Sequence, residues 1–304
     1  MYTLYSQEAD DLPAWVARDS SFRSGAFIVF GVRIQSSPSL LLATLALQCG
    51  PAPVPDIQRS EFAAWLRSSE VSPYAAIYHQ PFSGTLVLGP SANPPLSGLP
   101  AATLEQGVFR LTLERSEGSR TVARNRPVPL GDWHVLVSGN SETSYVTVFQ
   151  PAFDADPPGW FAIDSSLVIE GLLEGPEAHE IRPMLGLDGV RVEAALAGTL
   201  VMDLANRRIR LVVYRMPEPG SDVEELSIFF RDETNGRDTY SAGRFLTLRP
   251  LGNDRYVADF NRARNPFCAY NSIYPCPLPW RGNDMTIPIE AGEKYHGGGL
   301  EISG

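Results

Sequence analysis

Two polar segments in the C-terminal half of the chain carry the residue types that could do chemistry. The first is RDETNGRDTYSAG (231–243), a thirteen-residue connection between two apolar runs and too long for a tight turn. Its carboxylates Asp232 and Asp238, with the phenol of Tyr240, could act as acid and base in a hydrolysis, which needs groups with separated pKa values. Asp232 could equally cap its own loop by accepting hydrogen bonds from the backbone amides of Asn235 and Gly236. Asp232, Asp238 and Tyr240 are therefore the candidate catalytic residues, and a structural role stays open for Asp232.

The second polar segment is DFNRARNPFCAYNSIYPCPLP (259–279), which holds two of the three cysteines, eight positions apart. A loop of this composition is either a stapled structural corner or the wall of a site. Arg244 and Arg262 could clamp a carboxylate or a phosphate in bidentate fashion. A buried pair between an arginine and Asp232 or Asp259, which would only tie the loops together, is an equally good interpretation.

The strands around these segments decide whether the two segments meet. If strands 226–230, 244–248 and 255–260 are neighbours in sequence order, both segments leave the sheet at the same end, because every second connection of a meander returns to the same edge. We therefore expect one polar rim that binds a ligand. Its candidate ligand-binding residues are Thr239, Tyr240, Arg244, Asn261, Arg262, Asn265 and Tyr270.

The cysteine pair predicts a disulfide between Cys268 and Cys276 if the protein is exported to an oxidising compartment. Zinc is the rival explanation, but the spacing is not C-x-x-C and no histidine lies in the segment. The four histidines are scattered, and the sequence contains no G-x-S-x-G, P-loop or dinucleotide-binding glycine motif. We predict neither a metal nor a cofactor.

The strings FFRDETNGRDTYSAGRFL, DFNRARNPFCAYNSIYPCPLPW and IPIEAGEKY follow a recurrent pattern. They resemble a bacterial and archaeal domain-of-unknown-function family with the motifs F-x-D-x-T-x-G-x-x-T-Y-x-x-G-R, D-F-N-x-A-x-N-P-x-C-A-Y and C-P-x-P. A looser likeness upstream extends the resemblance over most of residues 70–295. The family has no established activity, so the resemblance implies where a site lies and no chemistry. The residues at motif positions are Asp232, Thr234, Gly236, Thr239, Tyr240, Gly243, Arg244, Asp259, Asn261, Asn265, Pro266, Cys268, Tyr270 and Cys276.

Apolar periodicity predicts a mainly β protein with one short N-terminal helix. Helical spacing covers residues 60–70, with Ser60 as its N-cap, and from Pro73 onward the period is two, with frequent turn signals. This pattern is typical of an antiparallel sandwich or a partly open barrel. The proline-rich interval 151–160 separates two packed halves, an N-terminal helix plus β half (56–155) and a C-terminal β half (156–304). Four hairpins are expected, within residues 108–124, 133–150, 199–215 and 244–260.

The first 55 residues differ from the rest. Residues 32–55 read as an export signal followed by a proline-rich tether, with an apolar run at 40–47 and Cys49 where a lipoprotein would be cleaved and acylated. Residues 1–31 would then be a leader or precede the true start codon. A short core helix or strand is the alternative for the apolar run, which is far below the roughly 20 residues of a membrane span.

Charge narrows the choice of partners. The chain has 25 basic and 35 acidic residues, a net charge of −10, which argues against nucleic acid because that partner needs a concentrated positive face. We predict an exported cell-envelope protein, joined to the membrane only through an N-terminal lipid or signal, that binds a small polar or anionic ligand or an envelope protein. A metal-independent hydrolase acting on a small anionic substrate, and a structural module without a pocket, are the alternatives.

Overall fold

A computed structural model describes residues 57–106, 111–115, 118–140, 143–221 and 223–295. The chain divides into two compact units, residues 1–65 and 66–304. The prediction of a mainly β fold with one short N-terminal helix is confirmed. That helix, α1 (Ile57–Ser68), begins three residues before the expected Ser60. The signal-like segment and Cys49 lie outside the described residues, and within them no helix has the length and apolar character to cross a membrane.

The N-terminal strands form two four-stranded antiparallel sheets with the orders β1-β8-β7-β6 and β2-β3-β4-β5. Side chains from both sheets pack into one apolar core, Leu88 and Leu104 from one and Val137 and Val146 from the other. This is the packing of a sandwich. The expected hairpins β4–β5 and β7–β8 are present. The strands are β1 (Ala76–Phe82), β2 (Thr85–Leu88), β3 (Ala102–Gln106), β4 (Leu111–Arg115), β5 (Gly118–Val122), β6 (Val128–Leu130), β7 (Trp133–Gly139) and β8 (Ser144–Phe149).

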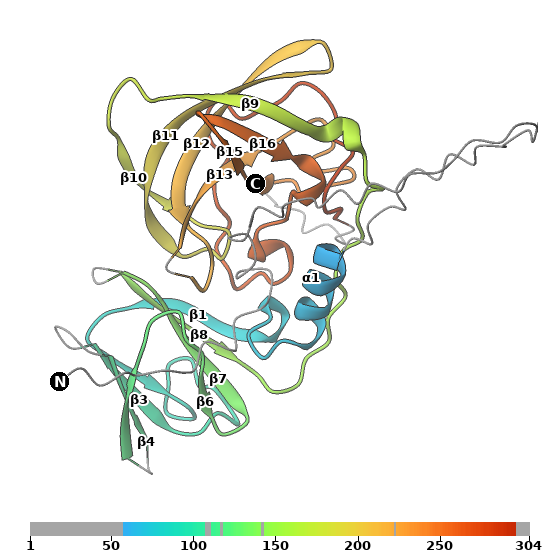
Figure 1. Ribbon diagram of the computed structural model, residues 1–304. Coiled ribbons are helices and arrows are strands. Elements are labelled where there is room, and N and C mark those ends of the chain that lie inside the picture. Colours follow the sequence, from blue (N-terminus) through green and yellow to red (C-terminus); the bar gives the residue numbers. More distant parts are fainter. Residues whose placement is uncertain (1–56, 107–110, 116–117, 141–142, 222, 296–304) are drawn as a thin grey trace, which may run out of the picture. The chain divides into compact units, whose positions relative to one another are not determined.

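The C-terminal strands form one eight-stranded sheet in the order β14-β13-β12-β11-β9-β16-β15, with β10 beside β11 (Figure 1). Its two end strands, β14 and β15, are separated in the chain by Leu248 alone, a reach of at most about 8 Å. The sheet must therefore curl until its ends approach each other, as a half-barrel does. The strands are β9 (Val168–Glu174), β10 (Ile181–Leu185), β11 (Arg191–Leu204), β12 (Arg207–Pro217), β13 (Glu224–Phe230), β14 (Arg244–Thr247), β15 (Arg249–Gly252) and β16 (Arg255–Asp259).

The inner face of the curled sheet holds the larger apolar core. Leu211 and Val213 of β12 point into it with Ile228 of β13 and Leu246 of β14. Because side chains alternate along a strand, Arg210, Val212 and Tyr214 lie on the opposite, outer face. The cleft described below lies on this outer face.

The expected meander is wrong. β14 pairs with β13, whereas β16 pairs with β9 and β15. The predicted strand 244–248 is present as β14 and ends at Thr247; the amide of Leu248 bonds the carbonyl of Leu226, and the chain continues as β15 at the other end of the sheet. Pro250 cannot donate to a ladder, which suits β15 to an edge position.

Candidate functional site

The loop 231–243 is closed by its own polar side chains. One carboxylate oxygen of Asp232 accepts hydrogen bonds from the amide and the hydroxyl of Thr234, at 2.9 and 2.6 Å. The amide oxygen of Asn235 accepts from the backbone of Asp232, and the hydroxyls of Thr234 and Thr239 are 2.8 Å apart. Asp232 therefore caps its own loop, but through the amide of Thr234 and not through those of Asn235 and Gly236.

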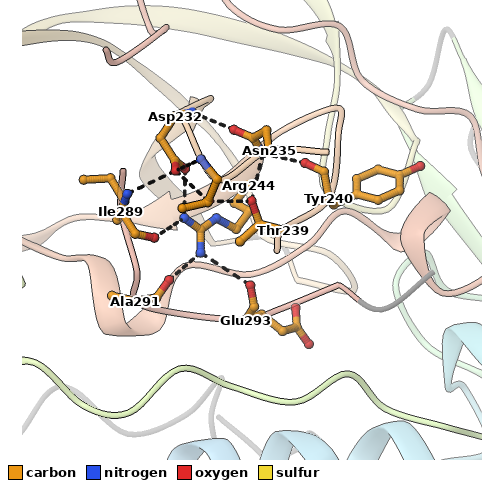
Figure 2. A network of polar contacts seen from close by, with 9 residues as sticks. Asp232, Asn235, Thr239, Tyr240, Arg244, Ile289, Ala291 and Glu293 are labelled. Carbon is orange, nitrogen blue, oxygen red and sulfur yellow. Dashed lines mark hydrogen bonds and ion pairs between the residues drawn. The ribbon is translucent and has the colours of Figure 1, made fainter. Parts of the chain in front are cut away.

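Arg244 fastens this loop to the C-terminal segment of the chain. Its side chain is fully buried, and one terminal nitrogen donates to the second carboxylate oxygen of Asp232 and to the carbonyl of Ile289, each at 2.9 Å. The other terminal nitrogen donates to the carbonyls of Ala291 and Glu293 (Figure 2). Burial lowers the pKa of Arg244, and the charge of Asp232 opposes that shift. The guanidinium thus joins the loop to residues 289–293.

Glu293 is a buried acid that the sequence reasoning did not single out. Its carboxylate accepts from the amide of Asn265 at 2.7 Å and from the hydroxyl of Tyr270 at 2.6 Å. Burial raises its pKa to about 7, against the opposing effects of the Tyr270 and Asn265 hydrogen bonds and of two arginines. A sequence signal existed, since apolar residues recur with period two from Met285 to Ala291 and Glu293 falls in the same phase.

The remaining candidates divide between enclosed and solvent-facing positions. Asn261 is buried, where its amide bonds both backbone groups of Asp164 at 2.8 Å. Arg262 is exposed, and Asp238 is partly exposed and paired with Arg237 at 2.7 Å. Asp232 and Asp238 therefore do not form a carboxyl pair, and the proposed catalytic and ligand-binding roles stay predictions.

The two polar segments do converge, by a route other than the meander. A disulfide joins Cys268 to Cys276, as predicted, with Cα atoms 5.5 Å apart. The hydroxyl of Tyr240 lies 3.4 Å from the Cys268 sulfur and 3.2 Å from that of Cys276. The backbones of Phe245 and Arg264 exchange two hydrogen bonds. Most of the polar groups brought together in this way form hydrogen bonds with one another.

A cleft of about 910 Å³ opens beside the second polar segment. Its floor is the outer face of the curled sheet, formed by β10, by residues 196–199 of β11 and by residues 210–214 of β12. One wall is residues 174–180, which connect β9 to β10, two strands that both pair with β11, and the other wall is residues 277–281. A volume of this size suits a small-molecule site.

Gly198 lines this cleft where β11 approaches the wall 174–180. It sits at the bulge of β11 with φ +141°, and a Cβ there would lie 2.1 Å from the carbonyl oxygen of Glu174. No larger residue could keep this approach of β11 to the wall.

The wall 277–281 is attached to the sheet at its C-terminal end. The amide of Asn283 pairs with both backbone groups of Val212, at 2.7 and 3.0 Å, and donates to the carbonyl of Phe229. The ring of Trp280 packs edge-on to Tyr214, with centroids 5.0 Å apart. Leu278, in the middle of the wall, is 82% exposed.

The arginines that line the cleft differ in whether they have an ion-pair partner. Arg210 pairs with Glu174 at 2.7 Å and Arg182 pairs with Glu180. Over the described ranges, no carboxylate lies within ion-pair distance of Arg281. This guanidinium is therefore available to an anionic group in the cleft. Within the same ranges no three metal-ligating side chains cluster.

The family model described as "Protein of unknown function (DUF1684)" matches residues 158–294. The looser likeness expected upstream of residue 158 lies outside that match. Among solved structures, an uncharacterized protein of Haloarcula marismortui, determined by solution NMR, is 30% identical. That match covers 46% of this chain and 76% of the other, with a TM-score of 0.40. No curated protein matches. Through residues 158–294, which hold the buried network, the disulfide and the cleft, the chain belongs to the DUF1684 family of proteins of unknown function.

Proposed function

We propose that the C-terminal sheet is a binding domain that takes a small ligand with an apolar part and one anionic group. The observation that carries this proposal is the cleft of about 910 Å³ on the outer face of β10, β11 and β12. Met184, Leu196 and Val212 supply a half-buried apolar floor. Arg281 supplies a guanidinium, which favours carboxylate, sulfonate or phosphate. Sites for small molecules combine these features, a mostly apolar lining with few polar groups.

We also propose that the protein works outside the cytoplasm, in the cell envelope. The disulfide supports this because such bonds persist in oxidising compartments and are rare in the cytosol. The signal-like residues 32–55 support it independently.

The two alternatives have less support. In a hydrolase, Asp232 or Asp238 would need a carboxylate free to exchange a proton with substrate. Both oxygens of Asp232 accept hydrogen bonds inside the protein, and Asp238 pairs with Arg237. A structural module without a pocket fits poorly with the open cleft.

A matched pair of fluorescent probes tests the binding proposal. 8-Anilinonaphthalene-1-sulfonate has an apolar ring system and an anion, and N-phenyl-1-naphthylamine is its neutral counterpart. Arg281→Gln should raise the Kd of the sulfonate about tenfold, the effect of losing one charge-assisted hydrogen bond, and should leave the neutral probe unchanged. The readout is a fluorescence titration of the folded full chain.

Arg255→Gln is the control, because Arg255 is exposed and pairs with Glu170 on β9 outside the cleft. Its Kd values should equal those of the wild type. A second variant, Thr199→Trp, fills the floor and should weaken both probes. Equal affinity of the wild type and Arg281→Gln for the sulfonate would refute the proposed anion site, and unchanged binding in Thr199→Trp would refute the cleft.

A further inference from the structure

The disulfide lies directly beside the cleft. Cys276 precedes Pro277, the first residue of the wall 277–281, and its partner Cys268 belongs to the short 3-10 helix η4 (Phe267–Ala269). The bond therefore joins the N-terminal end of the wall to the body of the domain. The C-terminal end is held separately, by Trp280 and Asn283.

Between these two anchors the wall is held by packing of the buried Pro277 rather than by backbone hydrogen bonds. Pro275, Pro277 and Pro279 have no backbone N–H and cannot donate a hydrogen bond. In the part of the chain that the structure describes, no backbone hydrogen bond involves residues 276–279. Pro277 is buried and Leu278 is exposed, so packing of Pro277 and the covalent bond at Cys276 together hold the N-terminal end of the wall.

The two cysteine residues differ in exposure. Cys268 is 8% exposed and packs in the interior, whereas Cys276 is exposed. An external thiol or disulfide can therefore reach Cys276 first. The hydroxyl of Tyr240, 3.2 Å from the Cys276 sulfur, can donate a hydrogen bond to the thiolate of the reduced chain. Burial and the neighbouring Tyr295 raise the pKa of Tyr240, so the phenol keeps its proton at neutral pH.

We propose that the cleft binds its anionic ligand only when Cys268 and Cys276 are joined, so that oxidation switches the site on, with Cys276 as the sulfur that exchanges with the oxidant. This inference rests on the proposed binding function and adds its regulation. With Tyr240 as hydrogen-bond donor to Cys276, the arrangement makes Tyr240 a positioning residue for the exchange. A chain still in a reducing compartment would lack the activity, and transfer to an oxidising one would supply it.

The chemistry is a thiol–disulfide exchange with an oxidant that is itself a disulfide, such as a disulfide oxidoreductase. The Cys276 thiolate attacks one oxidant sulfur, forms a mixed disulfide and releases the other sulfur as a thiolate. The Cys268 thiolate then attacks the Cys276 sulfur and releases the second oxidant sulfur. Both protein thiols lose their protons to solvent or to the leaving thiolates, and the oxidant takes up two electrons.

The test compares oxidised and dithiothreitol-reduced full-length protein in a Cys49→Ser background, which removes the third thiol. The readout is the Arg281-dependent ratio of Kd values for the two probes. This ratio is insensitive to general loosening, because nonspecific binding does not require Arg281. In the oxidised protein Arg281→Gln should change the ratio about tenfold. In the reduced protein, which should still unfold cooperatively, the effect of Arg281→Gln should fall, because Trp280 and Asn283 still hold Arg281 but residues 276–278 no longer position the probe beside it.

The outcomes separate the two proposals. If the oxidised protein shows no dependence on Arg281, the binding function itself fails. If oxidised and reduced proteins show the same dependence, the function stands and the redox inference is overturned. Loss of cooperative unfolding on reduction would also overturn it, since the bond would then serve the whole fold.

A second measurement addresses the exchange without any ligand. In the reduced protein Cys276 should react faster than Cys268 with iodoacetamide, as resolved by peptide mass spectrometry. Tyr240→Phe keeps the ring and removes the hydroxyl, and should slow reoxidation by glutathione disulfide several-fold at neutral pH. Equal labelling of the two cysteines, or an unchanged reoxidation rate, would contradict the assigned roles.

Discussion

Arg244 shows how one buried charge can organise a segment of chain. It is fully buried and bonds to Asp232 and to three backbone carbonyls from residues 289–293. Desolvation makes a buried ion pair a poor source of net stability, but removing one partner leaves the other charge uncompensated. The network therefore specifies how the loop meets the C-terminal segment.

Arg244→Met, which keeps the volume and removes the charge, should lower the free energy of unfolding by about 3–5 kcal/mol. Arg244→Met/Asp232→Asn should lose less than the single variant, because the orphaned carboxylate is gone. Arg255→Met, at an exposed ion pair, should change stability by less than about 1 kcal/mol. Urea unfolding measures all three, and an Arg244→Met variant as stable as Arg255→Met would contradict the assignment.

Glu293 predicts a pH dependence of stability. Its pKa is raised from 4.5 to about 7 in the folded state, so the folded protein binds a proton more tightly than the unfolded chain. The contribution is complete below pH 4.5 and is lost as the pH rises through 7. Relative to Glu293→Gln, the wild type should lose up to about 3 kcal/mol between pH 4.5 and 8. Stability curves of the two proteins across that range check the sign.

The matched control for this comparison is Glu290→Gln, at an exposed position of the same segment. Its difference from the wild type should not vary in the same way with pH. A constant difference for Glu293→Gln as well would mean that the buried carboxyl ionises as freely as in the unfolded chain.

At the scale of elements, two hairpin turns share one backbone geometry with different residues. Ala205-Asn206 joins β11 to β12 and Asn253-Asp254 joins β15 to β16, and in both turns φ is +52° and then +58°. These are the positive φ values of a type I′ turn, in which asparagine and glycine are favoured and alanine is strained.

Replacing the first residue of each turn by the first residue of the other should therefore change the free energy of unfolding in opposite directions. Ala205→Asn should raise the free energy of unfolding by about 0.5–1 kcal/mol, and Asn253→Ala should lower it by a similar amount. Both positions are exposed, so packing contributes little. Chemical denaturation measures the pair, and two changes of the same sign would rule out this explanation.

At the scale of the whole molecule, the export proposal makes a prediction about the native protein. Its mature N-terminus should lie near Cys49, and its mass should reflect the loss of the two thiol hydrogens of Cys268 and Cys276. Intact-mass and peptide mass spectrometry of protein from its native source test both points, and also detect any lipid on Cys49. Protein that starts at Met1 with two free thiols would place it in the cytosol.

Local physics made part of this molecule predictable from the sequence. Period-two apolar patterns and turn residues located the hairpins β4–β5, β7–β8 and β11–β12, because strand and turn formation depend on neighbours in the chain. The pairing of Cys268 with Cys276 and the capping by Asp232 are also short-range. The resemblance of residues 231–279 to a motif pattern located the family region.

Only the tertiary structure decided the strand order, the burial of Glu293 and the cleft. β16 pairs with β9 across more than eighty residues, and no local pattern distinguishes that partner from β14. The cleft is built on Arg210, Val212 and Tyr214, whose alternation with the core residues of β12 indicates an ordinary solvent face. A cleft forms there because Trp280 and Asn283 hold a distant proline-rich segment against that face, and such long-range contacts depend on how complete surfaces fit together.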